Sequence, residues 1–353
     1  MKVLAKVLGG LVLLLAGVFA LAVQAAPAVL ERPALHSAKA ERSVMLGLAR
    51  AGQRLVAVGE RGIILLSDDD GASWRQAEVP VSVNLTAVQF VDAQQGWAVG
   101  HLGVVLHSAD GGETWHKQLD GIQAAELVLQ AAEASGDAAA IEQARAMVAD
   151  GPDKPFLGLY FQDAQVGYLV GAYNLILRTT DGGQRWQSWM PHLDNPQALN
   201  LYAMGAWRGD LYIVGERGLL LRSRDGGERF AALPSPYEGS FFGLLAARDG
   251  LLAYGLRGNA WWSDDGGETW QVLETDVESA LAAALELADG RLLLAGQGGE
   301  LLAAQPGSAR ARSLPLRLAP GLASVVQAAD GSLASGGLSG VAVQQLSEQS
   351  AQR

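Results

Sequence analysis

Five short carboxylates recur in one motif and are the first candidates for chemistry in this 353-residue chain. Each motif follows Ser/Thr-x-Asp-x-Gly-x-x-aromatic, as in SADGGETW from Ser108, and is called an Asp-box turn below. A carboxylate in a tight turn accepts backbone N–H bonds, the glycine supplies a positive φ, and the aromatic ring packs against neighbouring sheets. Five copies cannot all be catalytic, so we interpret them as structural. Their aspartates are Asp69, Asp110, Asp181, Asp225 and Asp265, and their aromatic residues are Trp74, Trp115, Trp186, Phe230 and Trp270.

Other residue types with chemical potential lack the spacing that catalysis or metal binding needs. The Asp-rich pieces at 68–70 and 264–265 resemble calcium ligands, but an EF-hand loop ending in Glu is absent. The chain has no cysteine, no Gly-x-Ser-x-Gly elbow and no phosphate loop. We therefore expect no metal, no cofactor and no catalytic residue. The histidines, none with a metal-ligand spacing on one element, are His36, His101, His107, His116 and His192.

Arginines in a second recurring motif could bind carboxylates. The motif is an apolar strand ending in Gly, two further residues, usually a second Gly, and another apolar run, as in VAVGERGIILLS from Val56. A guanidinium fork fits a carboxylate, so arginines at these turns favour recognition of an acidic peptide. The alternative is solvated turn residues, because Glu60 and Glu216 lie beside two of the arginines. The candidate partner-binding residues are Arg61, His101, Tyr173, Arg217 and Arg257, with His101 and Tyr173 taken as replacements for the arginine.

An internal repeat of about 41 residues supplies the elements that must position both kinds of turn. It contains seven units, of which only the first five keep the Asp-box turn. Short β runs between Gly-rich turns at this period are typical of propeller blades, and helical periodicity is missing from the repeats. The sequence predicts an all-β, seven-bladed β-propeller over 26–353. The leading glycines of the units are Gly59, Gly100, Gly171, Gly215, Gly255, Gly296 and Gly337.

Two departures from the repeat lead to further predictions. The seventh unit has candidates for only three strands, so we expect the N-terminal segment 28–35 to supply the fourth strand and close the ring. An insertion at 120–155 separates the second and third units and contains two Ala-rich runs with helical apolar spacing, divided at Gly136. We expect a helical hairpin there. Long insertions in compact repeats are often functional, and a decorative cap is the alternative.

Blade topology assigns the two kinds of turn to opposite faces. With the strands of a blade lettered A to D, the A–B and C–D turns lie on one face, and the B–C turns and D-to-A connections lie on the other. The Asp-box turns are C–D turns, and the Gly-x-x-Gly turns are B–C turns. The insertion belongs to a D-to-A connection, so we expect the hairpin on the arginine-bearing B–C face, where function is also expected.

The first residues indicate an exported protein. Lys2 and Lys6 precede an apolar run from Val7 to Val23, and small residues follow, which predicts a signal peptide over 1–25 cleaved near Ala25. A retained membrane anchor is the alternative. Export without cysteine fits a bacterial periplasmic or secreted protein. The formal net charge of −11 disfavours nucleic acid as a partner.

The combined motif resembles a known family. FVDAQQGWAVGHLGVVLHSADGGETW from Phe90 and FQDAQVGYLVGAYNLILRTTDGGQRW from Phe161 are similar to repeats of photosystem II stability/assembly factors, and the Asp-box alone to bacterial neuraminidase repeats. The resemblance covers about residues 43–346 and implies a seven-bladed, chaperone-like binder in membrane-complex assembly with an arginine patch. The patch carries over to Arg61 and Arg217 by motif and to Arg257 by position.

These observations favour a non-enzymatic, protein-binding assembly or scaffold factor for a membrane or envelope complex. We expect no small-molecule substrate and a monomer outside its complex. The alternative is a sialidase-like glycoside hydrolase or glycan-binding propeller. Sialidase chemistry needs an arginine trio, a Tyr nucleophile with a nearby Glu, and an acid/base Asp. Arginines are available, but no Arg-Ile-Pro motif precedes the first Asp-box turn. A third hypothesis is a structural accessory that binds through the insertion.

Overall fold

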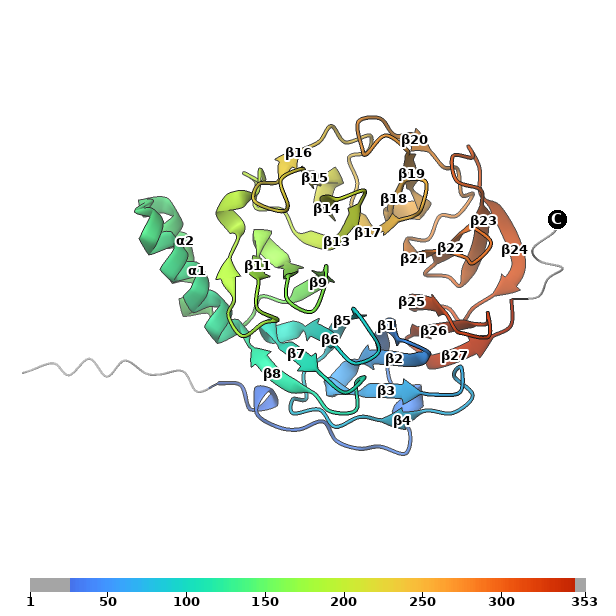
Figure 1. Ribbon diagram of the computed structural model, residues 1–353, viewed down its shortest axis with the longest axis horizontal. Coiled ribbons are helices and arrows are strands. Elements are labelled where there is room, and N and C mark those ends of the chain that lie inside the picture. The colour runs from blue at the N-terminus through green and yellow to red at the C-terminus, as the bar shows by residue number, and fades with distance from the viewer. Residues whose placement is uncertain (1–25, 347–353) are drawn as a thin grey trace, which may run out of the picture.

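The computed structural model describes residues 26–346, which form seven antiparallel sheets arranged in a ring (Figure 1). Six sheets have four strands and the seventh has three, and consecutive strands are neighbours in every sheet. The prediction of a mostly-β propeller with seven blades is confirmed. The predicted signal peptide at 1–25 lies outside the described residues, as do residues 347–353.

The strands are short, and the outermost strand of several blades has only two residues. Blades one to three consist of β1 (Met45–Ala51), β2 (Arg54–Gly59), β3 (Ile64–Ser67) and β4 (Arg75–Gln76); β5 (Leu85–Phe90), β6 (Gly96–Gly100), β7 (Val105–Ser108) and β8 (His116–Leu119); and β9 (Phe156–Phe161), β10 (Gly167–Gly171), β11 (Ile176–Thr179) and β12 (Gln187–Ser188). Blades four to seven consist of β13 (Leu201–Trp207), β14 (Asp210–Gly215), β15 (Leu220–Ser223) and β16 (Ala231–Ala232); β17 (Phe241–Ala246), β18 (Leu251–Gly255), β19 (Ala260–Ser263) and β20 (Gln271–Val272); β21 (Leu281–Glu286), β22 (Leu292–Gly296), β23 (Glu300–Ala304) and β24 (Arg312–Arg317); and β25 (Leu322–Gln327), β26 (Leu333–Gly337) and β27 (Gly340–Gln344).

The core lies between neighbouring blades, because each sheet packs its apolar side chains against the next sheet. Strand β6 is buried at all five positions. In the core between blades one and two, Val58 and Leu66 pack with Ala98 and Leu106. Burying an aliphatic side chain of this size contributes about 1.5–3 kcal/mol, so the repeated apolar strands stabilise the ring blade by blade.

In six of the seven units, the leading glycine is required by a close approach of two backbone segments. A Cβ atom at Gly59 would collide with the carbonyl oxygen of Val44, which precedes strand A of the same blade. The same collision would occur between Gly100 and Asn84. Strand A therefore begins against the end of strand B, and a side chain at this position has no room.

The prediction that segment 28–35 adds a fourth strand to blade seven is wrong. Residues Ala28–Leu30 form a 3₁₀ turn, η1, and the segment lies along blades one and two. The Ser82 N–H donates to the carbonyl of Val29 at 2.9 Å, and the Ala34 N–H donates to the carbonyl of Val79 at 3.0 Å. The physical reason is Leu30, which is buried in the core between these two blades and draws the segment away from blade seven.

Residues slightly later in the chain do contribute to closure of the ring. The 3₁₀ turn η2 (Ala40–Arg42) contacts β27, and β1 packs against β25 and β26. A Cβ atom at Gly340 would collide with the carbonyl oxygen of Glu41. In blade one, a Cβ atom at Gly62 would collide in the same way with the carbonyl oxygen of Val81, which lies in a D-to-A connection. The N-terminal segment therefore takes the place of the D-to-A connection of blade seven, and not of its fourth strand.

The predicted helical hairpin between blades two and three is confirmed. It consists of α1 (Gly121–Ser135) and α2 (Ala138–Asp150). The Asp120 side chain accepts two backbone N–H bonds at the start of α1, and Gly136, with a φ of +71°, ends that helix. Among the described residues, no helix is long and apolar enough to cross a membrane.

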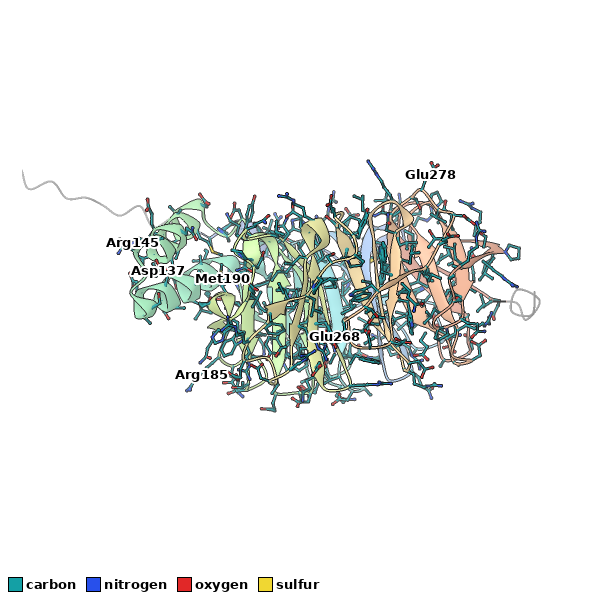
Figure 2. The ribbon with its side chains drawn as sticks, turned by 90° about the horizontal axis from the view of Figure 1, so that it is seen from above. Asp137, Arg145, Arg185, Met190, Glu268 and Glu278 are labelled. Atoms are coloured by element: carbon teal, nitrogen blue, oxygen red, sulfur yellow. The ribbon has the colours of Figure 1, made fainter. Side chains whose placement is uncertain are left out.

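The hairpin lies at the rim of the ring and not over the B–C face, where the sequence analysis placed it (Figures 1 and 2). Helix α1 contacts β12, the outermost strand of blade three. Val128 and Ala132 pack in the same core as Trp186, with Met190 packed against it, so the apolar face of α1 turns toward the side of the blade. Seen from the side, the ring has two faces, with Arg185 and Glu268 at one and Glu278 at the other (Figure 2).

Candidate functional site

The B–C turns of the first five blades share one backbone conformation. Each is a single 3₁₀ turn whose middle residue has a φ between +53° and +56°. A left-handed conformation costs a non-glycine residue about 1–2 kcal/mol, so the surrounding structure must hold these residues in place. The turns are η3 (Glu60–Gly62), η4 (His101–Gly103), η5 (Ala172–Asn174), η7 (Glu216–Gly218) and η8 (Leu256–Gly258), and their middle residues are Arg61, Leu102, Tyr173, Arg217 and Arg257.

The predicted equivalence of His101 with the arginine of the turn is wrong. Leu102 takes the middle position that Arg61 takes in blade one, while His101 takes the position of Glu60. The His101 side chain is still exposed on the same face. Counting from the leading Gly100 would have identified Leu102, because the Gly-x-x-Gly frame is the same in both blades.

Side chains from the next blade fix the middle residues of three turns. The Arg61 N–H donates to Asn84 Oδ1 at 2.9 Å, the Tyr173 N–H to Asn200 Oδ1 at 2.8 Å, and the Arg217 N–H to Ser240 Oγ at 3.3 Å. Each acceptor immediately precedes strand A of its own blade. These bonds use the backbone of the turn and leave the side chain of the middle residue exposed.

The glutamates beside two of the arginines bond to backbone. Glu60 Oε1 accepts a hydrogen bond from the Val44 N–H at 3.2 Å, and Glu216 Oε2 accepts one from the Asn200 N–H at 3.2 Å. Both bonds lie within the blade of the glutamate. The neighbouring glutamates therefore hold the start of strand A and form no ion pair with Arg61 or Arg217.

Three exposed guanidinium groups result. Within residues 26–346, Arg61, Arg217 and Arg257 form no ion pair and no side-chain hydrogen bond. Many arginines on the Asp-box face are paired instead: Arg54 bonds to Asp68 at 2.6 Å and to Glu113 at 2.9 Å. Unpaired guanidinium groups on backbone-fixed turns are available to carboxylates of another molecule.

An apolar hollow of about 410 Å³ lies on the same face of the ring. Its walls come from blades one, five, six and seven, so it spans the mouth of the central channel on the B–C face. Leu338, on the B–C turn of blade seven, is 67% exposed at its edge. The hollow can accept an apolar side chain of another molecule. Its lining includes Leu46, Phe242, Leu281, Gln297, Leu322 and Leu338.

The Asp-box turns are closed upon themselves. Asp69 Oδ1 accepts bonds from Ser67 Oγ at 2.8 Å and from the Ser73 N–H at 2.9 Å, and the Gly71 N–H donates to Ser67 Oγ at 2.8 Å. Asp110, Asp181, Asp225 and Asp265 accept the corresponding pair of bonds in their own turns. The aromatic residue that follows packs into the inter-blade core, as Trp115 and Phe230 do.

Hydrogen bonds lower the pKa of the Asp-box carboxylates. The pKa of Asp69 falls to about 2, first because of the Ser73 hydroxyl and then because of the Ser73 N–H and the Ser67 hydroxyl. The pKa of Asp181 is lowered mainly by the Arg185 N–H, and that of Asp225 mainly by the Ser223 hydroxyl. These carboxylates are ionised acceptors over the neutral range, which leaves them no role as proton donors.

Sequence reasoning missed several residues of the B–C face. The hydrogen-bonding side chains Asn84, Asn200 and Ser240 precede apolar strands and could have been found by aligning the starts of the repeats. The exposed side chains of Leu256 and Leu338 gave no signal, because apolar turn residues are common. In the part of the chain that the structure describes, no group of three or more His, Asp or Glu side chains could hold a metal ion.

Comparisons with known proteins agree with this architecture. The model of the family described as "Photosynthesis system II assembly factor YCF48" matches residues 66–154 and 146–237. No curated protein sequence matches the chain. The fold is similar to a structure of YCF48 bound to D1 peptide, with a TM-score of 0.62 and 15% identity over 90% of this chain and 99% of the other. It is also similar to YCF48 from Cyanidioschyzon merolae, with a TM-score of 0.62 and 14% identity over 86% and 95% of the two chains. The WD40 propeller of Doa1 gives a TM-score of 0.63 at 11% identity over 91% and 97%.

Proposed function

Because this chain belongs to the photosynthesis system II assembly factor family, we propose that it is a non-enzymatic protein that binds a polypeptide of a membrane or envelope complex during assembly. The proposal includes export by the predicted signal peptide to the periplasm or cell exterior. The solved relative was obtained with D1 peptide, which supports a polypeptide as the partner class.

One observation carries the proposal: three guanidinium groups without partners stand on left-handed B–C turns, on the face that also carries an apolar hollow. An unpaired arginine binds a carboxylate through two parallel N–H···O bonds, and the hollow gains free energy from an apolar side chain. The combination fits an acidic segment with alternating carboxylate and apolar side chains. Arg61, Arg217 and Arg257 would bind the carboxylates, and Tyr173 would provide an exposed aromatic contact.

The geometry gives a glycosidase less support. The five Asp-box aspartates lie on the opposite face and accept hydrogen bonds from their own turns. These bonds lower the pKa values of their carboxyl groups. A general acid needs a pKa near the working pH. We therefore keep partner binding as the function and treat the arginines as its recognition groups.

Charge reversal on the B–C face tests the proposal. The triple variant Arg61→Glu, Arg217→Glu, Arg257→Glu should reduce capture of the partner from the envelope at least tenfold. It should also weaken binding of a labelled leucine–glutamate peptide measured by fluorescence anisotropy. A matched control reverses Arg185, Arg229 and Arg248, which are exposed on the Asp-box face and likewise form no ion pair within the described residues. Equal binding by both triple variants would refute the proposal.

A further inference from the structure

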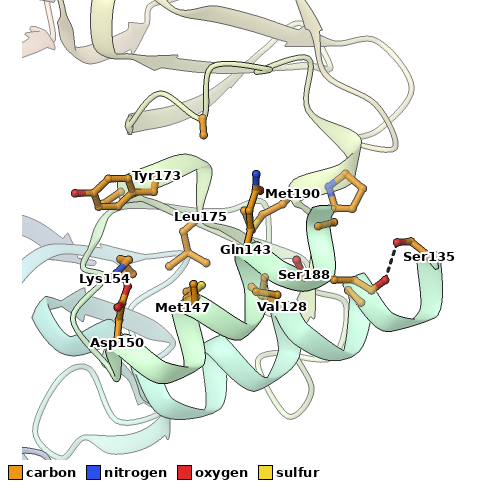
Figure 3. A pocket seen from close by; sticks show the side chains of 18 of the residues that line it. Val128, Ser135, Gln143, Met147, Asp150, Lys154, Tyr173, Leu175, Ser188 and Met190 are labelled. Atoms are coloured by element: carbon orange, nitrogen blue, oxygen red, sulfur yellow. Dashed lines mark hydrogen bonds and ion pairs between the residues drawn. The ribbon is translucent and has the colours of Figure 1, made fainter. Parts of the chain in front are cut away.

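A groove of about 660 Å³ separates the helical hairpin from blade three (Figure 3). One wall is formed by α1 and α2, and the other by the B–C turn of blade three and the connection that follows β12, which includes the 3₁₀ turn η6 (Met190–His192). Lys154 and Asp150 lie at one end and Ser135 at the other (Figure 3). The groove therefore runs along the hairpin and is separate from the central hollow.

The helix wall of the groove is mostly apolar, and half of its lining residues are alanines. On α2 the lining residues Ala140, Gln143, Ala144 and Met147 follow the spacing of one helical face. On α1 the lining residues include Val128 and the small Ala131 and Ala132. Small side chains allow another backbone to approach closely, so a face of this kind is suited to packing against a third helix.

The opposite wall supplies larger apolar contacts. Leu175 and Met190 face the helices across the groove, and the Tyr173 ring stands at its edge (Figure 3). Tyr173 is 65% exposed and is the middle residue of a B–C turn. The groove is thus continuous with the face that carries the unpaired arginines.

The hairpin and the residues that follow it carry a net negative charge. Residues 121–154 carry two basic side chains, Arg145 and Lys154, against six acidic ones. Lys154 Nζ is bound by Asp153 at 2.5 Å and by Asp150 at 3.2 Å, and lies 5.4 Å from the Tyr173 ring centre. Its charge is therefore already neutralised. The acidic side chains are Glu126, Glu133, Asp137, Glu142, Asp150 and Asp153. Asp150 and Asp153 line the groove, and Glu133 pairs with Arg145 at 3.6 Å.

We infer that the groove binds an amphipathic helix with a basic polar face, supplied by the same partner. The apolar face of that helix would lie on the alanines of α1 and α2, and its lysines or arginines would meet the acidic side chains of the hairpin. Helix α1 has 15 residues, or about 22 Å of length, which accommodates a partner helix of about four turns. The inference rests on the proposed function, since the partner is the polypeptide held by the B–C face.

A defined probe tests the groove without the natural partner. We would use a labelled 15-residue peptide of leucine and lysine arranged with helical periodicity (a length of about four helical turns). A second peptide has the same composition in strict alternation, and a third replaces lysine by glutamate. The full chain should bind the helical lysine peptide at least tenfold more tightly than the other two at this site, measured by fluorescence anisotropy, with helix formation followed by circular dichroism.

A matched pair of variants locates the binding. Ala140→Trp should fill the groove and weaken binding of the helical lysine peptide at least tenfold. Ala139→Trp places the same ring on an exposed neighbour that does not line the groove, and should leave binding unchanged. Thermal unfolding checks that both variants fold. Equal binding by the two variants, or equal binding of the alternating peptide, would overturn the inference.

The same measurements distinguish a partner helix from other occupants of the groove. They also distinguish failure of this inference from failure of the proposed function. If the wild-type chain is a dimer that Ala140→Trp dissociates, a second copy fills the groove and the inference fails. It also fails if the peptide binds only after removal of residues 1–25. The charge-reversal triple should leave lysine-peptide binding intact, and Ala140→Trp should leave leucine–glutamate-peptide binding intact. Failure of one site is therefore distinguishable from failure of the other.

Discussion

The two faces of the ring use polar side chains in opposite ways. On the Asp-box face, a carboxylate such as Asp110 accepts bonds from its own turn, and arginines such as Arg54 are paired with Asp68 and Glu113. On the B–C face, Asn84 and Glu60 bond to backbone, and the guanidinium group of Arg61 is left unpaired. A polar group satisfied within the fold stabilises it, and one left exposed is available for binding. The B–C face can therefore bind a partner without breaking hydrogen bonds or ion pairs that stabilise the fold.

The glycines of the B–C turns should show the largest effect on stability. At Gly62 the φ is +74° and a Cβ atom would collide with the carbonyl of Val81. We expect Gly62→Ala to lower the free energy of unfolding by roughly 2–4 kcal/mol, from backbone strain and overpacking together. Urea denaturation measures it. Gly136→Ala is the control, because its φ is also positive but nothing lies within 4 Å; it should cost only about 1 kcal/mol.

Removing an Asp-box carboxylate should have an intermediate effect on stability and none on binding. Asp110→Ala leaves the hydroxyls of Ser108 and Thr114 and the Thr114 N–H without their acceptor. We expect a loss of roughly 1–3 kcal/mol in the free energy of unfolding. Peptide binding to the B–C face should be unchanged. A large loss of binding in a folded Asp110→Ala variant would contradict the division between the faces.

Acid should lower the stability of the fold by protonating the Asp-box carboxylates, while the arginines stay charged. The pKa of Asp69 is about 2 in the folded chain, against about 3.9 in an unfolded one. A lowered folded pKa contributes stability above the unfolded pKa and loses it as the pH falls through the folded pKa. We therefore expect the melting temperature to fall between about pH 4 and pH 2, and less steeply in Asp69→Asn. An identical slope in the variant would show that Asp69 is not responsible.

Truncating the arginines should have the smallest effect on stability. Arg61→Ala removes no hydrogen bond and no ion pair within residues 26–346. The free energy of unfolding should change by less than about 0.5 kcal/mol, as for most surface substitutions. Binding of the leucine–glutamate peptide should weaken, and more salt should weaken it further because exposed charges are screened. A destabilised Arg61→Ala variant would mean that this side chain belongs to the fold.

The sequence predicted the ring because its evidence was repeated. The repeated residues meet local structural requirements, such as the close approach at Gly59 and the hydrogen-bonded turn around Asp69. A local requirement that recurs from unit to unit can be recognised from the spacing of the residues along the sequence. For blade two the sequence pattern predicts strands over 85–91, 96–99, 104–107 and 115–118, and the observed bounds differ from these by no more than one residue. The helical hairpin was predictable for the same reason, since apolar periodicity and Gly136 are local signals.

Only the tertiary structure decided where the irregular segments lie. Leu30 is buried between blades one and two and Val128 against the side of blade three, and neither docking site is adjacent in sequence. The same holds for the candidate sites. The sequence identified Arg61, Arg217 and Arg257 by their turns, but their lack of partners depends on Glu60 and Glu216 bonding elsewhere. The groove beside Tyr173 arises only where the hairpin meets blade three, because a cavity is a property of packed surfaces and leaves no pattern along the chain.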